Sequence, residues 1–338
     1  MGIALLDFVI IAKQGHNSFY QALKHDKALD YVADGFQMGI FDHFEEESNY
    51  TDKPKFTFID LFAGIGGFHL AASNLGGQCV FASEFDENAR KTYEANFLKH
   101  NKDLFYSGNF AGDITKVDEK TIPDFDFLFA GFPCQPFSQA GFKKGFNEIR
   151  GTLFFNIVNI VKEKQPSVFF LENVRGLLNH DDGKTFETIK KIITKDLGYS
   201  FFYKIIKASD FGLPQHRPRL FMVGFKDEKI KFTFPKAQKL NTTMSDIWNG
   251  DCPKKVGYTL RVGGRGSKID DRRNWDSYMV NGKIKQLSSN EGKKMQGLPN
   301  HFIFPVSETQ AMKQLGNSVA VPAIQTVIKQ IMTYYESK

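Results

Sequence analysis

The feature that most constrains the fold is an alternation of short apolar runs with segments of helical apolar spacing, between residues 56 and 225. Runs typical of buried strands occupy residues 56–60, 78–83, 125–131, 167–173, 201–209 and 219–225. Helical patterns lie between them, first up to about residue 75 and then at 86–100, 153–164 and 183–197, with a last one at 321–335. This alternation predicts an α/β fold with a doubly wound, mostly parallel sheet. In such sheets ligands bind at the carboxyl ends of the strands.

The alternation stops near residue 232, which suggests a second and smaller region. Residues 236–300 are rich in Gly, Lys, Arg, Asn and Asp and show few periodic apolar runs. A chain of 338 residues suits one large domain and one small one. We therefore expect an N-terminal extension of unassigned role at 1–55, a main domain at 56–230, a small irregular domain at 231–300, and a segment at 301–338 that returns to the main domain.

Charge and cysteine content narrow the class of protein. The formal net charge of +6 weakly favours a polyanionic partner. The three cysteines lie far apart without a metal-ligand pattern, so neither a zinc site nor a disulfide scaffold is expected. The sequence shows neither a signal peptide nor an apolar run of about 18 residues that would span a membrane. We expect a soluble intracellular protein that requires no metal.

A glycine-rich segment, DLFAGIGG, follows the first expected strand and suggests a nucleoside site. Glycines here let the backbone approach a ligand closely. Glu84 stands twenty residues past Gly64, where an acid can bind ribose hydroxyls. His69 replaces the last glycine of the dinucleotide fingerprint, which disfavours a dinucleotide and favours a nucleoside such as S-adenosylmethionine. A tight turn without a ligand remains the alternative, and Asp113 is either an adenine contact or a turn residue.

A cysteine between two prolines follows the third expected strand, in the segment GFPCQPFS. The prolines restrict the loop, and a cysteine at the carboxyl end of a strand is placed for nucleophilic attack. The alternative is a buried structural cysteine. Cys79 fits that alternative better than Cys134 does, because Cys79 lies inside a strand and Cys134 has polar neighbours.

Two further strand ends bear charged residues. Glu172 ends the apolar strand SVFFLEN, where it is either a helix cap or a general acid with a raised pKa. Arg217 and Arg219 flank Pro218 at the start of a strand, on one face, where they can bind a base carbonyl or a phosphate. A solvated sheet edge would explain the two arginines equally well. The segment GNSVAVP, 316–322, either caps the last helix or completes the cofactor site.

Taken in order along the chain, these motifs resemble those of the DNA cytosine-5 methyltransferase family, of the bacterial restriction-modification type. The matching segments are FIDLFAGIGGF, GFPCQPFS, RGTLFF, LENV, PQHRPRLF and GNSVAVP. The resemblance extends from residue 56 to about residue 335. It implies a Rossmann-like S-adenosylmethionine-dependent fold, with residues 231–300 as a small target-recognition domain.

The resemblance also implies a mechanism and its catalytic residues. A cytosine flipped out of duplex DNA is attacked at carbon 6 by Cys134, while Glu172 protonates ring nitrogen 3. Carbon 5 then takes the methyl group of S-adenosylmethionine, a base removes the carbon 5 proton, and the cysteine leaves. Arg219 is expected to hold the cytosine carbonyl oxygen, and Arg217 to support the pocket.

Cofactor, DNA and partner assignments follow from the same resemblance. The expected cofactor contacts are Phe62, Gly64, Gly66, Glu84, Asp113, Ile114, Pro133 and Asn317. The segment YTLRVGG, 258–264, resembles a strand of the family, followed by a basic hairpin at 263–266. Because arginine commonly pairs with guanine edges, the expected base readers are Arg261, Arg265, Arg272 and Arg273, although a turn with a solvated face would explain them too. The expected protein is a cytoplasmic, DNA-associated monomer that acts on double-stranded DNA beside a cognate restriction endonuclease, with no membrane partner.

The resemblance leaves two alternatives and one departure. An RNA cytosine-5 methyltransferase shares these motifs, and a catalytically silent DNA-binding regulator could share the scaffold. The segment SSNEGKKMQGLP, 288–299, matches the family pattern only loosely, and the first 55 residues match nothing in it.

Overall fold

A seven-stranded sheet forms the centre of the computed structural model, which describes residues 53–133, 153–240 and 242–336. A compact unit begins at Pro54. The strands are β1 (Phe56–Leu61), β2 (Gly77–Ser83), β3 (Phe110–Ala111), β4 (Phe127–Gly131), β5 (Val168–Val174), β6 (Phe202–Lys207) and β7 (Pro218–Phe225). Nearly all of the expected N-terminal extension lies outside the described residues.

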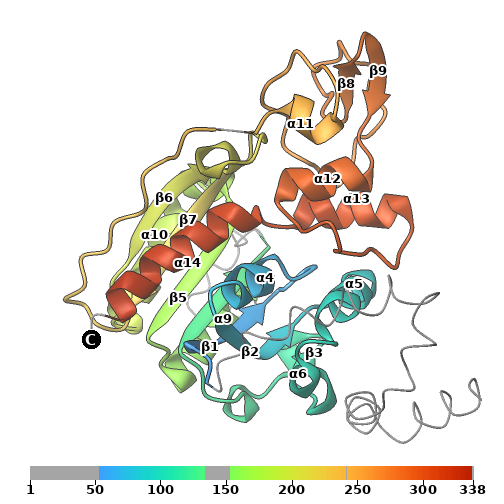
Figure 1. Ribbon diagram of the computed structural model, residues 1–338. Coiled ribbons are helices and arrows are strands. Elements are labelled where there is room, and N and C mark those ends of the chain that lie inside the picture. Colours follow the sequence, from blue (N-terminus) through green and yellow to red (C-terminus); the bar gives the residue numbers. More distant parts are fainter. Residues whose placement is uncertain (1–52, 134–152, 241, 337–338) are drawn as a thin grey trace, which may run out of the picture. The chain divides into compact units, whose positions relative to one another are not determined.

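The sheet confirms the predicted class and most of its strands. Its order is β3-β2-β1-β4-β5-β7-β6 (Figure 1). The pairs from β3 to β5 are parallel, and β7 runs antiparallel to both β5 and β6. The sequence did not indicate β3, which has only two residues. Because β1 and β4 are adjacent but separated in the chain by β2 and β3, the sheet winds outward in both directions from this pair.

Helices cover both faces of the sheet. On one face, alternate strand residues such as Phe58 and Phe129 join a core with α4 (Gly67–Ser73) and α14 (Val321–Tyr335). On the other, Ile59 and Leu128 pack with α9 (Leu153–Lys164) and α10 (Lys184–Lys191). Successive residues of a strand point to opposite faces, so buried runs of Phe, Ile and Leu predict this two-sided burial.

The helix bounds differ from the sequence expectations at several ends. The pattern at 86–100 becomes α5 (Glu87–Phe97), followed by α6 (Lys102–Tyr106). The pattern at 183–197 is α-helical only to Lys191 and continues as a π turn over Ile192–Asp196. The pattern at 153–164 and the last helix agree with the expected bounds. No helix among the described residues is long and apolar enough to cross a bilayer.

The region after residue 232 is built from short elements around buried aromatic rings. They are α11 (Met244–Trp248), β8 (Ser277–Val280), β9 (Lys283–Gln286), α12 (Ser289–Gln296) and α13 (Glu308–Asn317). Trp275 is fully buried, and Tyr278 nearly so. The hairpin of β8 and β9 turns at Asn281 and Gly282, which both have positive φ. An Asn-Gly pair is a strong hairpin signal, and the sequence analysis did not use it.

The expected strand at 258–264 is wrong. Gly257, just before this segment, forms an isolated bridge with Gln215, and residues 258–264 have no strand partner among the described residues. Side chains satisfy its backbone instead: Leu260 N donates to Gln215 Oε1 at 3.1 Å, and Tyr258 N donates to the Tyr278 hydroxyl at 2.8 Å. The expected hairpin at 263–266 is likewise absent from the described strands; the hairpin of this region lies at 277–286.

Candidate active site

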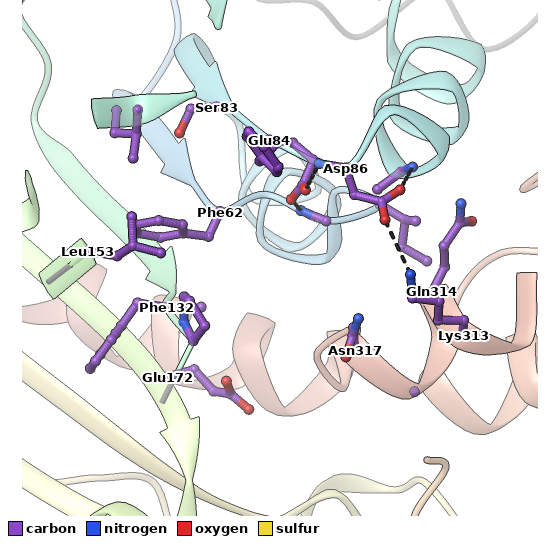
Figure 2. A pocket seen from close by; sticks show the side chains of 18 of the residues that line it. Phe62, Ser83, Glu84, Asp86, Phe132, Leu153, Glu172, Lys313, Gln314 and Asn317 are labelled. Carbon is purple, nitrogen blue, oxygen red and sulfur yellow. Dashed lines mark hydrogen bonds and ion pairs between the residues drawn. The ribbon is translucent and has the colours of Figure 1, made fainter. Parts of the chain in front are cut away.

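A cavity of about 740 Å³ opens at the carboxyl ends of β1, β2, β4 and β5. This volume is within the range of small-molecule sites. Its location is the one expected for a ligand of a doubly wound sheet. Among the predicted site residues, those that line it are Phe62, Gly64, Glu84, Asp113, Ile114, Pro133, Glu172, Arg217, Arg219 and Asn317. Figure 2 shows several of them projecting toward a common space.

The glycine loop and Glu84 form one end of the cavity. Phe62 and Gly64 have positive φ values of 56° and 57°, so the chain turns sharply after β1. Gly64 N donates to Glu84 Oε2 at 2.7 Å, and Asp86 N donates to Glu84 Oε1 at 2.7 Å. Burial raises the pKa of Glu84, and these backbone donors oppose the shift. The two amides orient a carboxylate toward the cavity, where ligand hydroxyls can reach it.

Gly66 has a packing function that differs from the expected cofactor contact. It does not line the cavity, and a Cβ built on it would lie 2.2 Å from the Phe97 ring. His69 stacks on the same ring, with centroids 4.0 Å apart, and its Nδ1 lies 2.5 Å from the Tyr93 hydroxyl. Burial lowers the pKa of His69 to about 3. His69 is therefore a neutral core residue that packs away from the cavity lining.

Asp113 lines the cavity and confirms the interpretation as a turn residue; its contact with an adenine stays a prediction. Its Oδ1 accepts from Thr115 N at 3.0 Å and from the Thr115 hydroxyl at 2.7 Å. The hydroxyl bond is the largest cause that lowers the pKa of Asp113. Asp113 thus caps a turn, and it also lines the cavity beside Ile114. Its Oδ2 lies 3.9 Å from Lys116 Nζ, whose side chain is 82% exposed.

A buried acid and an arginine form the opposite end of the cavity. Glu172 is 8% exposed at the end of β5, and Arg219 Nε lies 3.0 Å from Glu172 Oε1. In the antiparallel pairing of β5 with β7, Val174 lies opposite Arg219. Glu172 is two residues before Val174 and points to the same face of the sheet, so the side chains of Glu172 and Arg219 meet. Glu172 does not cap the 3-10 helix that follows, whose N-cap is Val174. Burial raises the pKa of Glu172, and the nearby arginines oppose the shift, so the carboxyl group can hold a proton.

Arg217, near Glu172, connects the start of β7 with two other segments, one around Leu260 and one at the end of α13. It is 2% exposed and donates to Leu260 O at 3.2 Å, to Gly316 O at 2.9 Å and to Ser318 O. Burial lowers the pKa of Arg217 to about 9. These bonds hold the end of α13 and the residue after it against β7, and Asn317, which lies between the two acceptors, lines the cavity. The two arginines therefore have different tasks, one structural and one beside the acid.

The predicted nucleophile, Cys134, lies outside the described residues. The chain up to it lines the cavity through Gly131, Phe132 and Pro133. Asn173 Nδ2 donates to Phe132 O at 3.0 Å and so fixes the end of β4 next to that of β5. Cys79 is buried inside β2, as expected of a structural cysteine.

Several cavity residues were missed by the sequence analysis. Phe85 is 76% exposed although it is a large apolar residue, and it lines the cavity directly after Glu84. An exposed aromatic ring at a cavity is a surface on which a flat ligand can stack. One wall is formed by α13, through Gln310, Lys313 and Gln314. The sequence offered an indication of this wall, because α13 leads directly into the GNSV segment at 316–319, which was a candidate for the cofactor site.

The four predicted DNA-reading arginines do not line the cavity. Arg265 Nε lies 3.7 Å from the buried Asp276, and its Nη2 donates to Leu287 O at 2.6 Å. Arg273 is paired with Asp271 at 2.7 Å. Arg261 and Arg272 are exposed. The guanidinium groups of Arg265 and Arg273 thus have intramolecular partners.

Comparisons with known proteins agree with this architecture. A family model described as C-5 cytosine-specific DNA methylase matches residues 56–262 and 253–333. Among similar proteins, the Type II methyltransferase M.HpaII of Haemophilus parainfluenzae is 42% identical over 86% of this chain and 92% of its own length. M.SsoII of Shigella sonnei is 42% identical over 84% and 82%, and M.HhaI of Haemophilus parahaemolyticus is 38% identical over 81% and 93%.

Solved structures show the same fold at lower identity. A DNMT2 variant of Spodoptera frugiperda has a TM-score of 0.62 at 20% identity and covers 82% of this chain and 99% of its own. A putative DNA modification methyltransferase from an Escherichia coli prophage has a TM-score of 0.62 at 20% identity, covering 83% and 99%. At this identity the likeness concerns the fold.

Proposed function

Because the chain belongs to the C-5 cytosine-specific DNA methylase family and is a DNA cytosine-5 methyltransferase, we propose that it methylates carbon 5 of a cytosine flipped out of a short duplex site. The methyl donor is S-adenosylmethionine, and the reaction passes through a covalent adduct with Cys134. The observation that supports this most is the buried pair of Glu172 and Arg219 beside the end of β4, from which the chain continues to Cys134.

The residues around the cavity suit S-adenosylmethionine. Ser83 Oγ, Gln310 Oε1 and Gln314 Nε2 are buried polar atoms of its lining with no partner among the described residues. Buried polar atoms are normally hydrogen-bonded, so a polar ligand accounts for them. Glu84 would hold the ribose hydroxyls, with Phe85 and Asp113 near the base and Asn317 on the opposite wall. When bound, the cofactor supplies an electrophilic methyl group.

Side chains of the protein supply the proton and stabilise the charge that develops on the cytosine. As the Cys134 thiolate adds to carbon 6, electron density moves to ring nitrogen 3, where Glu172 donates its proton. Arg219 holds the carbonyl oxygen and keeps the acid oriented. Carbon 5 then takes the methyl group, a base removes the carbon 5 proton, and the thiolate leaves carbon 6 as ring nitrogen 3 returns its proton to Glu172. Burial raises the pKa of Glu172, and this favours the role because desolvation disfavours the charged carboxylate.

The relatives named as Type II methyltransferases support a modification role within a restriction-modification system. A cognate endonuclease that acts on the same site, and a monomeric cytoplasmic enzyme, belong to this proposal. For DNA contacts we favour the exposed Arg261 and Arg272 over Arg265, whose guanidinium is held by Asp276 and Leu287.

Labelled S-adenosylmethionine with duplex DNA or RNA tests the proposal. We expect label in DNA only, and bisulfite sequencing of DNA from cells that express the chain should show protected cytosines in one short context. Label in RNA alone, or protection with no common context, would contradict it.

A further inference from the structure

Two walls of the cavity come from distant parts of the chain and are joined by two side-chain contacts. One wall is the end of β2 with the start of α5, and the other is α13. Lys313 Nζ lies 3.4 Å from Asp86 Oδ2 (Figure 2). Deeper in the protein, the Thr92 hydroxyl donates to Gln314 Oε1 at 2.9 Å across 222 positions of sequence.

The two contacts differ in strength because they differ in burial. The side chains of Lys313 and Asp86 are 42% and 40% exposed, so their ion pair is screened by solvent and weak. Thr92 is fully buried and Gln314 is 6% exposed. The hydrogen bond between them is shielded from water, and its loss would leave a buried acceptor unsatisfied. This bond, more than the ion pair, fixes the Gln314 side chain.

Gln314 uses only one end of its amide within the protein. Its Oε1 accepts from Thr92, whereas Nε2 is buried and has no partner among the described residues. Gln314 lines the cavity, and Thr92 does not. With the oxygen engaged, the amide nitrogen is left as a donor. A buried amide N–H without an acceptor is unfavourable, and a ligand in the cavity can supply the acceptor.

We propose that Gln314 donates a hydrogen bond to bound S-adenosylmethionine and that Thr92 is the positioning residue that orients it. The ligand offers acceptors in its carboxylate and its ribose oxygens. Thr92 then affects cofactor affinity without touching the cofactor. This inference rests on the proposed function, because it takes S-adenosylmethionine as the ligand of the cavity.

Isothermal titration of the full chain with S-adenosylmethionine tests the inference. Thr92→Val keeps the shape of the side chain and removes the hydroxyl, Thr92→Ser keeps the hydroxyl, and Gln314→Glu keeps the acceptor but removes the donor. We expect Kd to rise about fivefold to tenfold in Thr92→Val and at least as much in Gln314→Glu. In Thr92→Ser it should stay within about twofold of the wild-type value. Thr188→Val, the same change on α10 at a residue that does not line the cavity, should leave Kd unchanged.

A kinetic measurement separates positioning from general damage. In Thr92→Val we expect KM for S-adenosylmethionine to rise while kcat at saturation stays within about twofold. A wild-type Kd in Thr92→Val or in Gln314→Glu would overturn the inference. So would Thr92→Ser binding as weakly as Thr92→Val, because the hydroxyl would then be irrelevant. Failure of the wild-type chain to bind S-adenosylmethionine would instead overturn the proposed function, before any variant is compared.

Discussion

Replacement of Arg217 by methionine should destabilise the protein strongly, because it removes a buried cation that joins three segments. The guanidinium donates to the carbonyls of Leu260, Gly316 and Ser318. A hydrogen bond to a charged group contributes about 1.5–3 kcal/mol, and three such bonds would give an upper bound of roughly 5–9 kcal/mol. Relaxation and water entry reduce this sum, so we expect a loss of about 3–5 kcal/mol, as for other broken buried ionic contacts.

Urea denaturation followed by fluorescence measures this loss, with Arg219→Met as the matched control. Arg219 contacts Glu172 on the adjacent strand β5 and the carbonyl of its neighbour Pro218. We expect the urea midpoint to fall by about 1 M or more in Arg217→Met. The fall should be smaller in Arg219→Met, because burial raises the pKa of Glu172 and the acid can take up a proton when its partner is removed. In contrast, Arg219→Met should abolish methyl transfer while the protein stays folded. Equal midpoints for the two variants, or an Arg217→Met midpoint near wild type, would refute the assignment of a structural task to Arg217.

Three further predictions concern pH and packing. Burial raises the pKa of Glu172 above its ordinary value of 4.5. As pH rises from 4.5 through the raised pKa, the wild type should therefore lose stability relative to Glu172→Gln. If the free energies of unfolding of the two proteins change in parallel with pH, this prediction is wrong. The pKa of His69 is lowered to about 3, so stability should fall as pH drops below about 6.5, and His69→Phe should reduce that loss in acid-unfolding curves. Gly66→Ala should lower Tm more than Gly64→Ala, because only the former Cβ meets Phe97; the reverse order in calorimetry would contradict the packing assignment.

The sequence was most informative where local chemistry decides the structure. Buried strands with a continuous apolar run, such as the VFFL of 168–171, can be predicted because both faces of the sheet are covered by helices. The positions of Glu172 and Arg219 were predictable for the same reason, since Glu172 lies near the end of one buried strand and Arg219 at the start of another. Their 3.0 Å contact was not predictable, because it depends on the antiparallel register of β5 with β7.

What the sequence could not predict depends on distant contacts. Gly64 and Gly66 look alike in the glycine loop, but only the packing of Phe97 gives Gly66 its separate task. Arg265 looks like a free basic residue until Asp276 and Leu287 are seen beside it. The wall formed by α13 is set by long-range bonds such as that of Gln314 with Thr92. Local patterns contain no information on such partners.

Covalent trapping on DNA that contains 5-fluorocytosine at the methylated position tests the proposed covalent mechanism directly. Fluorine replaces the proton that must leave carbon 5, so an enzyme that attacks carbon 6 through Cys134 stays bound to its substrate. With S-adenosylmethionine present, we predict a denaturation-resistant complex for the wild type and none for Cys134→Ser. The absence of a complex in the wild type, or its persistence in Cys134→Ser, would contradict the proposed mechanism.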